Sequence, residues 1–381
     1  MGKRQTIALV YRFDEAWIAG SYYILNLIHA LNRLEDADKP ALIILTPSRK
    51  NFETVRITRY PYLQFRKFHP KRPAQSLFLR ALNKIGRIFF RRDLVDRYLR
   101  ADVLFPAVGH TYVSKVATRI FWIPDFQEHF LPRFFSKEEV LDRKKNQKGI
   151  VDSMCPVVLS SFTAAAHFRE IFPEARNEIH VLQFAVTHFE FERTPMGELL
   201  NKYKIDGPYF FCANQFWMHK NHITLLKAIR ITKWDLKKEI RVVFSGKEKD
   251  YRNPDYFNQI HDLVKEYEIE DSVRFLGYLD RNDQLQLMEG AMAVVQPSLF
   301  EGWSTVIEDA KALGQFVVAS AIPVHREQIS ENVLFFDPEN EMDLASHLTT
   351  LSTEAPLKKR VDYNLNVKKF GEEFMKLTVN P

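Results

Sequence analysis

The sequence feature that most constrains the fold is a regular alternation of short apolar runs with helical patterns, clearest in the second half of the chain. The apolar runs are continuous, as expected for parallel strands that are covered on both faces. This pattern predicts a doubly wound α/β domain whose ligands bind beyond the C-terminal ends of its strands. We expect strands at 209–213, 240–245, 273–276, 292–296 and 316–320, and helices at 221–233, 254–268, 282–289 and 305–313.

The first half repeats this scheme less regularly. At 381 residues, the chain is too long for one small core and suits two domains. Residues 186–207 lack this alternation of apolar runs and helical patterns and are interpreted as a linker. We predict a Rossmann-like domain over 1–190 and a second over 191–361, with a C-terminal helix (about 362–381) able to pack back on the first domain. The first domain is expected to have strands at 6–12, 41–46, 102–106, 119–123 and 157–159, and a helix at about 21–34.

Composition excludes several classes of protein. A hydrophobic content of 46% with 31 Phe excludes a largely disordered chain, and no apolar run approaches the ~20 residues of a membrane span. Cys155 and Cys212, the only cysteines, have no CxxC spacing, which indicates a reducing, cytoplasmic setting.

The net charge of +6 is unevenly distributed. Residues 66–100 hold eleven Lys/Arg against two Asp, which gives this segment +9 and leaves −3 for the remainder. Apolar and basic side chains interleave in it from Phe78 to Arg92. That pattern fits either peripheral docking on an anionic membrane surface or a core-facing helix with a solvated basic face. Nucleic-acid binding would use the same charges but would leave the strand-end motifs described below unexplained, so we expect no nucleic-acid partner.

The loop after the fourth strand of the second domain carries the strongest candidate site. The strand leads through Glu301-Gly302 into a helix near Ser304. Glu308 and Asp309 lie early in this helix, where the helix dipole stabilises acids, so ordinary capping explains part of the pattern. It does not explain Glu301, which precedes the helix and stands beside a glycine that lets a ligand approach the backbone. We therefore predict that Glu301 has a functional role.

Neighbouring strand-end loops add candidate ligand contacts. Lys220 falls at the N-terminal edge of a helix, where a cation is unfavourable unless an anion binds there, so we predict a phosphate contact. The next two strands end at Gly246-Lys247 and at Gly277-Tyr278; either turn could serve packing alone or a ligand. His219 and His222 have no third ligand nearby, so a metal site is not expected.

These segments together resemble the donor-binding signature of family 4 glycosyltransferases. The resemblance implies a GT-B fold, in which two Rossmann-like doubly wound α/β domains face each other across a cleft. It also implies a nucleotide sugar held mainly by the C-terminal domain, retention of anomeric configuration, no cofactor and no required metal. The matching runs are Ala213-Asn-Gln, Lys220-Asn, Leu226-Lys-Ala, Val243-Phe-Ser-Gly246, Val273-Arg-Phe-Leu-Gly277, Ser298-Leu-Phe-Glu-Gly-Trp303, Asp309-Ala-Lys-Ala-Leu-Gly314, Val317-Val-Ala-Ser320 and Pro323.

Carried over to this sequence, the family's paired acids fall on Glu301, beside the donor sugar, and Asp309, at the ribose. The second position is normally Glu, and since Glu308 precedes Asp309, either acid remains a candidate. The family's diphosphate-binding Arg and Lys fall on Gln215 and Lys220, so one counter-charge is missing, for which Lys247 or Arg326 could substitute. The other residues expected to bind the donor are Gly246, Gly277, Tyr278, Gly302, Trp303, Ser304 and Thr305.

The first domain resembles the family more weakly. Gly20 occupies the position of the family's glycine-containing loop after the first strand, close to donor phosphate or acceptor. Many relatives place His-Asp at the cleft end of a later strand. Here Pro124 takes the His position, Asp125 remains, and His129 could replace the imidazole. We therefore take Asp125 and His129 as catalytic candidates beside Glu301; the alternative is an ordinary surface loop.

The resemblance predicts a retaining hexosyltransferase that moves a sugar from a nucleotide-sugar donor to a glycan or lipid-linked acceptor. We expect it to act in cell-surface polysaccharide synthesis, in the cytoplasm at the inner face of the membrane. One alternative is a nucleotide-sugar epimerase or hydrolase on the same fold. Another is a catalytically inactive binding protein, which would account for Gln215, Pro124 and Asp309.

Overall fold

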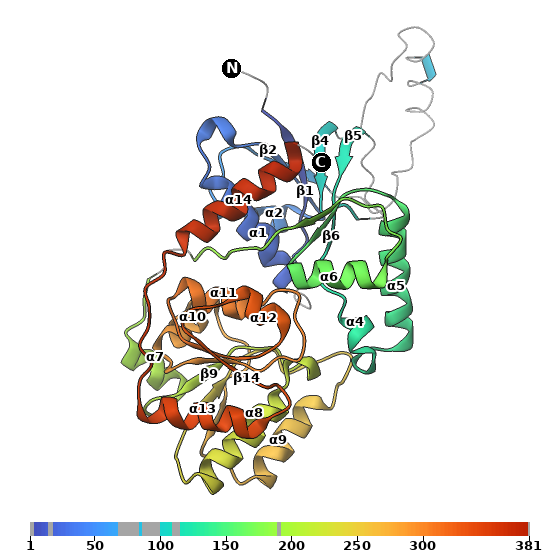
Figure 1. The fold of residues 1–381 in the computed structure, drawn as a ribbon. Helices are drawn as coiled ribbons and strands as arrows, with labels where there is room; N and C mark the ends of the chain where they lie inside the picture. Colours follow the sequence, from blue (N-terminus) through green and yellow to red (C-terminus); the bar gives the residue numbers. More distant parts are fainter. Residues whose placement is uncertain are drawn as a thin grey trace.

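The protein is described here by a computed structural model that covers residues 4–13, 18–67, 84–85, 100–108, 115–188 and 192–379. These residues form two α/β domains, one above the other in Figure 1. Most of the predicted basic segment 66–100 lies outside the described residues, so its two interpretations both stay open.

The N-terminal domain is built on a parallel sheet of order β3-β2-β1-β4-β5. Its central strand holds Ile7, Ala8 and Leu9, all fully buried, which accounts for the continuous apolar run. The edge strand β3 was not predicted because its sequence, Leu-Gln-Phe-Arg-Lys, has no such run. The elements are β1 (Thr6–Val10), α1 (Ile18–Asn32), a 3-10 turn (Asp36–Asp38), β2 (Ala41–Thr46), α2 (Arg49–Arg56), β3 (Leu63–Lys67), β4 (Arg100–Phe105) and β5 (Lys115–Arg119).

A second parallel sheet, of order β6-β7-β8, completes this domain. Its strands lead into the helices that border the other domain, and α6 lies directly against α12 there (Figure 1). The elements are β6 (Phe121–Ile123), α4 (Gln127–Phe130), a 3-10 turn (Pro132–Phe134), α5 (Lys137–Asp152), β7 (Val157–Leu159), α6 (Phe162–Ile171) and β8 (Ile179–Val181).

The C-terminal domain has a six-stranded parallel sheet of order β11-β10-β9-β12-β13-β14. Numbered within the domain, this is the order 3-2-1-4-5-6 of a Rossmann fold, which reverses between β9 and β12 and places its ligand crevice there. The strands are β9 (Phe210–Cys212), β10 (Val242–Phe244), β11 (Val273–Phe275), β12 (Val294–Gln296), β13 (Val317–Ser320) and β14 (Val333–Phe336).

The helices from β9 to β13 follow the predicted pattern, with one correction, while β14, α12 and α13 lie beyond the predicted elements. The predicted linker 186–207 contains a helix, α7, whose Leu199 is fully buried in the core of the second domain. The helices are α7 (Met196–Tyr203), a 3-10 turn (Met218–Lys220), α8 (His222–Arg230) with a π-helical extension (Ile231–Asp235), α9 (Tyr256–Glu266), α10 (Arg281–Gly290), α11 (Thr305–Ala312), α12 (Pro323–Gln328), α13 (Glu341–Thr353) and α14 (Asn364–Val379).

The last helix, α14, returns to the first domain and packs against α1 (Figure 1). Phe370 and Phe374 are buried in the same cluster as the residues of α1 and β1. The two helices approach closely at Gly371, where a Cβ would lie 2.7 Å from the carbonyl oxygen of Ala30. The N-terminal domain is therefore made of two separate segments of chain.

Within the described residues, no helix is long and apolar enough to cross a membrane.

Candidate functional site

A cavity between the two domains collects most of the predicted site residues. The N-terminal domain contributes Tyr22 and Tyr23 of α1 and the segment after β6, and the C-terminal domain contributes the loops at the C-terminal ends of its strands. This is the crevice expected from the sheet order. The predicted residues that line it are Asp125, Gln215, Lys220, Gly246, Lys247, Tyr278, Glu301, Gly302, Trp303, Ser304, Thr305 and Asp309.

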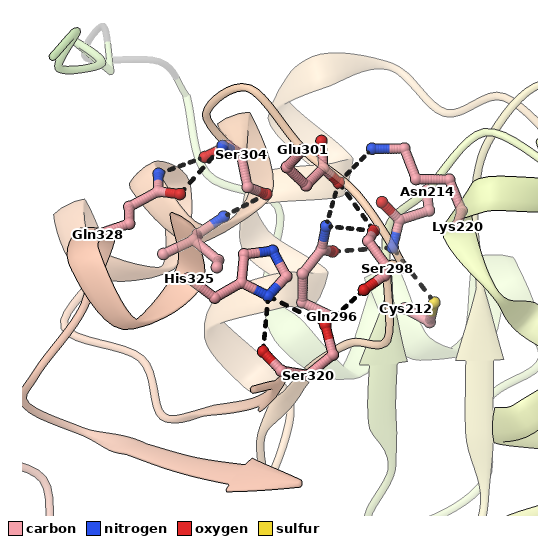
Figure 2. A network of polar contacts seen from close by, with 11 residues as sticks. Cys212, Asn214, Lys220, Gln296, Ser298, Glu301, Ser304, Ser320, His325 and Gln328 are labelled. Atoms are coloured by element: carbon pink, nitrogen blue, oxygen red, sulfur yellow. Dashed lines mark hydrogen bonds and ion pairs between the residues drawn. The ribbon is translucent and has the colours of Figure 1, made fainter. Parts of the chain in front are cut away.

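Glu301 is the centre of a polar network in this cavity (Figure 2). Its Oε1 accepts hydrogen bonds from Lys220 Nζ at 2.6 Å, Ser298 Oγ at 2.7 Å and Gln296 Nε2 at 2.9 Å. Asn214 in turn donates to Gln296 at 2.9 Å, which fixes the orientation of that amide. Within the part of the chain that the structure describes, no hydrogen bond reaches the second carboxylate oxygen, Oε2, which is therefore available for a ligand.

The ion pair of Lys220 and Glu301 is mostly removed from water, with side chains 16% and 10% exposed. Burial alone would raise the pKa of Glu301, but the adjacent Lys220 ammonium holds that pKa below its ordinary value. Glu301 is therefore a carboxylate at neutral pH. Because Lys220 already neutralises much of its charge, a negatively charged ligand can approach without strong repulsion.

The loop that carries Glu301 is held at its helical end by α12. Ser304 is the N-cap of α11, and its hydroxyl accepts from the amide of Ile307. Gln328 binds the Ser304 backbone twice, accepting from its amide at 3.0 Å and donating to its carbonyl at 2.7 Å. The N-terminus of α11, where Ser304, Thr305 and Val306 line the cavity, is thus held in place, and a helix N-terminus suits an anion.

Gly302 brings the two domains into backbone contact. A Cβ at this position would lie 2.1 Å from the carbonyl oxygen of Pro124 and 2.9 Å from Cβ of Asp125, so no larger residue fits without movement. Asp125 therefore lies against the Glu301 loop. Burial raises the pKa of Asp125, and the nearby charges of Glu128 and Glu301 add to this effect.

Asp309 and Glu308, which the sequence left as alternatives, have different surroundings. Asp309 lines the cavity, and its Oδ1 accepts from Arg281 Nη2 at 2.5 Å and from His188 Nε2 at 2.9 Å. Although burial alone would raise its pKa, Arg281 holds the pKa of Asp309 below its ordinary value. Of the two acids, Asp309 is the one placed to contact a ligand.

Glu308 points away from the cavity. Its carboxylate binds Lys311 Nζ at 2.7 Å and Gln328 Nε2 at 3.0 Å, and it accepts the hydroxyl of Tyr363 from the C-terminal tail. The same tyrosine hydroxyl accepts from the amide of Val186, in the segment that leaves the first domain. Through Tyr363, Glu308 therefore holds the two chain segments that connect the domains, one at Val186 and one at Tyr363. It is not placed to bind a ligand in the cavity.

Three more predicted residues lie outside the residues that line the cavity. His129 is engaged with Gln147 at 2.9 Å and packs against Phe172. Gly20 is buried in the first turn of α1, not in a loop as expected. Gly277 lies behind the lining, where its carbonyl accepts from the amide of Gly246. The structure gives none of them direct access to a ligand in the cavity.

The turn at Gly246 is needed for close packing behind the lining. Gly246 has a φ of +153°, and a Cβ there would lie 2.1 Å from the carbonyl oxygen of Asn214. This contact brings the ends of β9 and β10 together, so that Lys247 and Gln215 face the same cavity.

Sequence reasoning missed several residues that line the cavity. Arg281 is the most consequential, because it adds a cation beside Asp309 and lies over the ring of Tyr22 at 5.5 Å. Its position at the start of the helix after β11 was a usable signal, since a cation there is unfavourable without an acidic partner. The aromatic residues Tyr22, Trp122 and Trp217 also line the cavity; they come from elements whose relative placement the sequence pattern does not reveal.

Among the residues that the structure describes, no group of three or more His, Cys, Asp or Glu side chains is arranged to hold a metal ion.

Two Rossmann-like domains that face each other across a cavity form the GT-B fold, and solved glycosyltransferases share it. A glycosyltransferase from Rickettsia africae superposes with a TM-score of 0.62 at 14% identity, covering 100% of this chain and 94% of the other. HepE from Anabaena, in complex with UDP and glucose, gives a TM-score of 0.60 at 13% identity, covering 98% and 94%.

Residues 198–369 match the model of the family described as glycosyl transferases group 1. The O-antigen chain mannosyltransferase RfbU of Salmonella typhimurium is 27% identical over 143 residues, which cover 38% of this chain and 38% of RfbU. The O-antigen chain mannosyltransferase B of Escherichia coli is 24% identical over 297 residues, covering 77% and 71%. Over residues 198–369 this chain is therefore similar to group 1 glycosyltransferases.

Proposed function

We propose that this protein transfers a hexose from a nucleotide-sugar donor to a glycan or lipid-linked acceptor, with retention of configuration, in the synthesis of a surface polysaccharide. The observation that carries the proposal is the buried Lys220–Glu301 pair, which lies in the interdomain cavity beside the N-terminus of α11. The names of the O-antigen mannosyltransferases support a polysaccharide product and make a mannose donor the first to test. Such an enzyme would work in the cytoplasm, at the inner face of the membrane.

In this proposal the donor's diphosphate lies at Lys220 and at the amides of Gly302, Trp303 and Thr305, since the amide of Ser304 is already bound to Gln328. These groups are already oriented, and they stabilise the negative charge that grows on the leaving diphosphate without a metal ion. Asp309 accepts from the ribose through Oδ2, while Arg281 and His188 hold Oδ1. Arg281 supplies a further cation in the cavity beside Lys220 and Lys247, which compensates for the uncharged Gln215.

The bond between the anomeric carbon and the diphosphate oxygen breaks, and its electron pair leaves with the nucleoside diphosphate. An acceptor hydroxyl oxygen bonds to the same face of that carbon, and its proton passes to the departing phosphate oxygen. Glu301 positions the sugar through its free Oε2 and stabilises positive charge at the anomeric carbon. Asp125, which lies against the Glu301 loop and lines the same cavity, orients the acceptor hydroxyl.

A screen of nucleotide sugars tests the donor class. Melting temperatures would be measured with UDP-, GDP-, ADP- and dTDP-sugars, and transfer would then be assayed with the sugar that stabilises most. Rapid acceptor-free epimerisation or hydrolysis of that sugar would overturn the transferase proposal in favour of the same-fold alternatives. If none of the sugars raised the melting temperature, both enzyme readings would fail.

Two variants test the site. Glu301→Gln and Lys220→Ala should each lose turnover while the fold is retained, because each removes one member of the buried pair. Lys227→Ala is the matched control: Lys227 lies on the following helix, is 42% exposed and pairs only loosely with Glu341. Wild-type turnover in either site variant would refute the assignment. Turnover that survives chelation with EDTA would support chemistry without a metal.

A further inference from the structure

One carboxylate of the C-terminal domain binds across the domain boundary. Glu327 of α12 accepts at Oε1 from the amide of Phe162 and from Gln183 Nε2, both at 2.7 Å. Its Oε2 accepts from the amide and the hydroxyl of Thr163, both at 2.9 Å. All four donors belong to the N-terminal domain, so a single side chain makes four interdomain hydrogen bonds.

These bonds complete the cap of helix α6. The first amides of any helix have no partner within it. Ser161, the N-cap, satisfies the amide of Ala164 at 2.9 Å, and Glu327 satisfies the amides of Phe162 and Thr163. A carboxylate at this position also interacts favourably with the helix dipole, and its bonds are charge-assisted. Part of the cap is therefore supplied by the opposite domain.

The same short helix, α12, also holds the loop that carries Glu301. Gln328, the residue after Glu327, binds Ser304 twice. On the face of α12 toward the sheet, Nδ1 of His325 and the hydroxyl of Ser320 form a hydrogen bond of 3.1 Å, as Figure 2 shows. Two adjacent residues of α12 thus bind both sides of the boundary: Glu327 binds the N-terminal domain, and Gln328 binds the loop that carries Glu301.

We propose that Glu327 is a positioning residue that fixes the N-terminal domain against the Glu301 loop. The contact it protects is the one between Gly302 and Pro124, which has no room for even one additional carbon atom. Loss of Glu327 would let α6 and the Asp125 segment move away from the loop. Among the described residues, the hydrogen-bond partners of Glu327 are Phe162, Thr163 and Gln183, none of which lines the cavity, so we expect the donor still to bind. The expected loss of turnover rests on the proposed function, whereas the expected change in domain placement does not.

The test compares Glu327→Ala and Glu327→Gln with Ser161→Ala. Ser161→Ala removes a cap bond from the same helix without touching the interdomain bonds. Spin labels at Leu141→Cys and Met342→Cys, both exposed and one on each domain, report the interdomain distance in a Cys155→Ser background. Turnover and the Kd of the nucleoside diphosphate are measured for each variant.

We expect Glu327→Ala to broaden the distance distribution and to lower kcat by about ten- to a hundredfold, since misplacement of about 1 Å has effects of that size. The Kd of the nucleoside diphosphate should stay within about threefold of wild type, because uniform binding is retained. Glu327→Gln, which keeps an acceptor oxygen, should fall between. Ser161→Ala should lower the melting temperature, but its interdomain distance distribution should remain that of the wild type.

A wild-type distance distribution in Glu327→Ala would overturn the inference, as would equal broadening in Ser161→Ala. If the wild-type protein transferred no sugar, the proposed function would fail, while the distance measurement would still decide the role of Glu327.

Discussion

The substitution Gly302→Ala isolates the contact between the domains at the site. The added Cβ would lie 2.1 Å from the carbonyl oxygen of Pro124, where ordinary contact begins at 3.4 Å. The loop and the opposite backbone must therefore separate by about 1.3 Å, the difference between these two distances. Neither side can yield by a side-chain rotation, because the atom contacted belongs to the backbone.

A displacement of that size should reduce kcat/KM by about a hundredfold, which corresponds to roughly 2.7 kcal/mol of transition-state stabilisation. The folded state of each domain should be little affected, so the melting temperature should change by only a few degrees. The assay is steady-state transfer with the preferred nucleotide sugar, together with circular dichroism to monitor folding.

Gly197→Ala is the matched control for this substitution. Gly197 lies in helix α7, and a Cβ there would meet nothing within 4 Å. That variant should keep wild-type turnover and gain a little stability from the better helix former. Wild-type turnover in Gly302→Ala would refute the reasoning, because it would mean that the two backbones need not touch during transfer.

Three further predictions follow from the site and its buried ionisable groups. Lys220→Met should raise the pKa of Glu301, whose lowered value depends on that ammonium, so the acid limb of any residual activity should move to higher pH in a pH–rate profile. Asp309→Asn should weaken the binding of the nucleoside diphosphate, as measured by calorimetry. Glu308→Gln should leave that affinity intact and lower the free energy of unfolding by about 3 kcal/mol. The reverse result would exchange the roles of the two acids. Burial lowers the pKa of His222 to about 3, so it stays neutral in the folded protein while the unfolded chain takes up a proton below pH 6.5. Stability should therefore fall as the pH drops from 6.5 toward 4, by roughly 3 kcal/mol for this residue, and His222→Phe should flatten that part of the pH dependence in denaturant titrations.

Most strand positions of the second domain were predictable, because β9, β10, β12 and β13 are fully buried and read as continuous apolar runs. The edge strand β3 was missed because it has an exposed face and no such run. The edge strand β14 was missed although its sequence, Val-Leu-Phe-Phe, is apolar. Helix α7 was missed because it is only two turns long and buries one residue, Leu199, fully. Local pattern thus recovers the fully buried strands and is less reliable for short helices and for strands at the edge of a sheet.

The candidate site was predictable where it depends on strand-end motifs, and not where it depends on side-chain direction. Glu308 and Asp309 are neighbours in sequence, yet successive helical residues point about 100° apart, so only one can face the cavity. The choice is set by Tyr363, some fifty residues away, which engages Glu308. His129 was nominated by its spacing from Asp125, but the four-residue helix α4 turns it toward Gln147.

The return of α14 to the first domain has a consequence for biosynthesis. Phe370 and Phe374 belong to the core that α1 and β1 begin, so that core lacks part of its apolar surface until the ribosome has added α14. The second domain, whose strands run from Phe210 to Phe336, contains all of its sheet before then. We therefore expect the domain that is translated last to finish folding first, with the nascent first domain left as the species most in need of a chaperone.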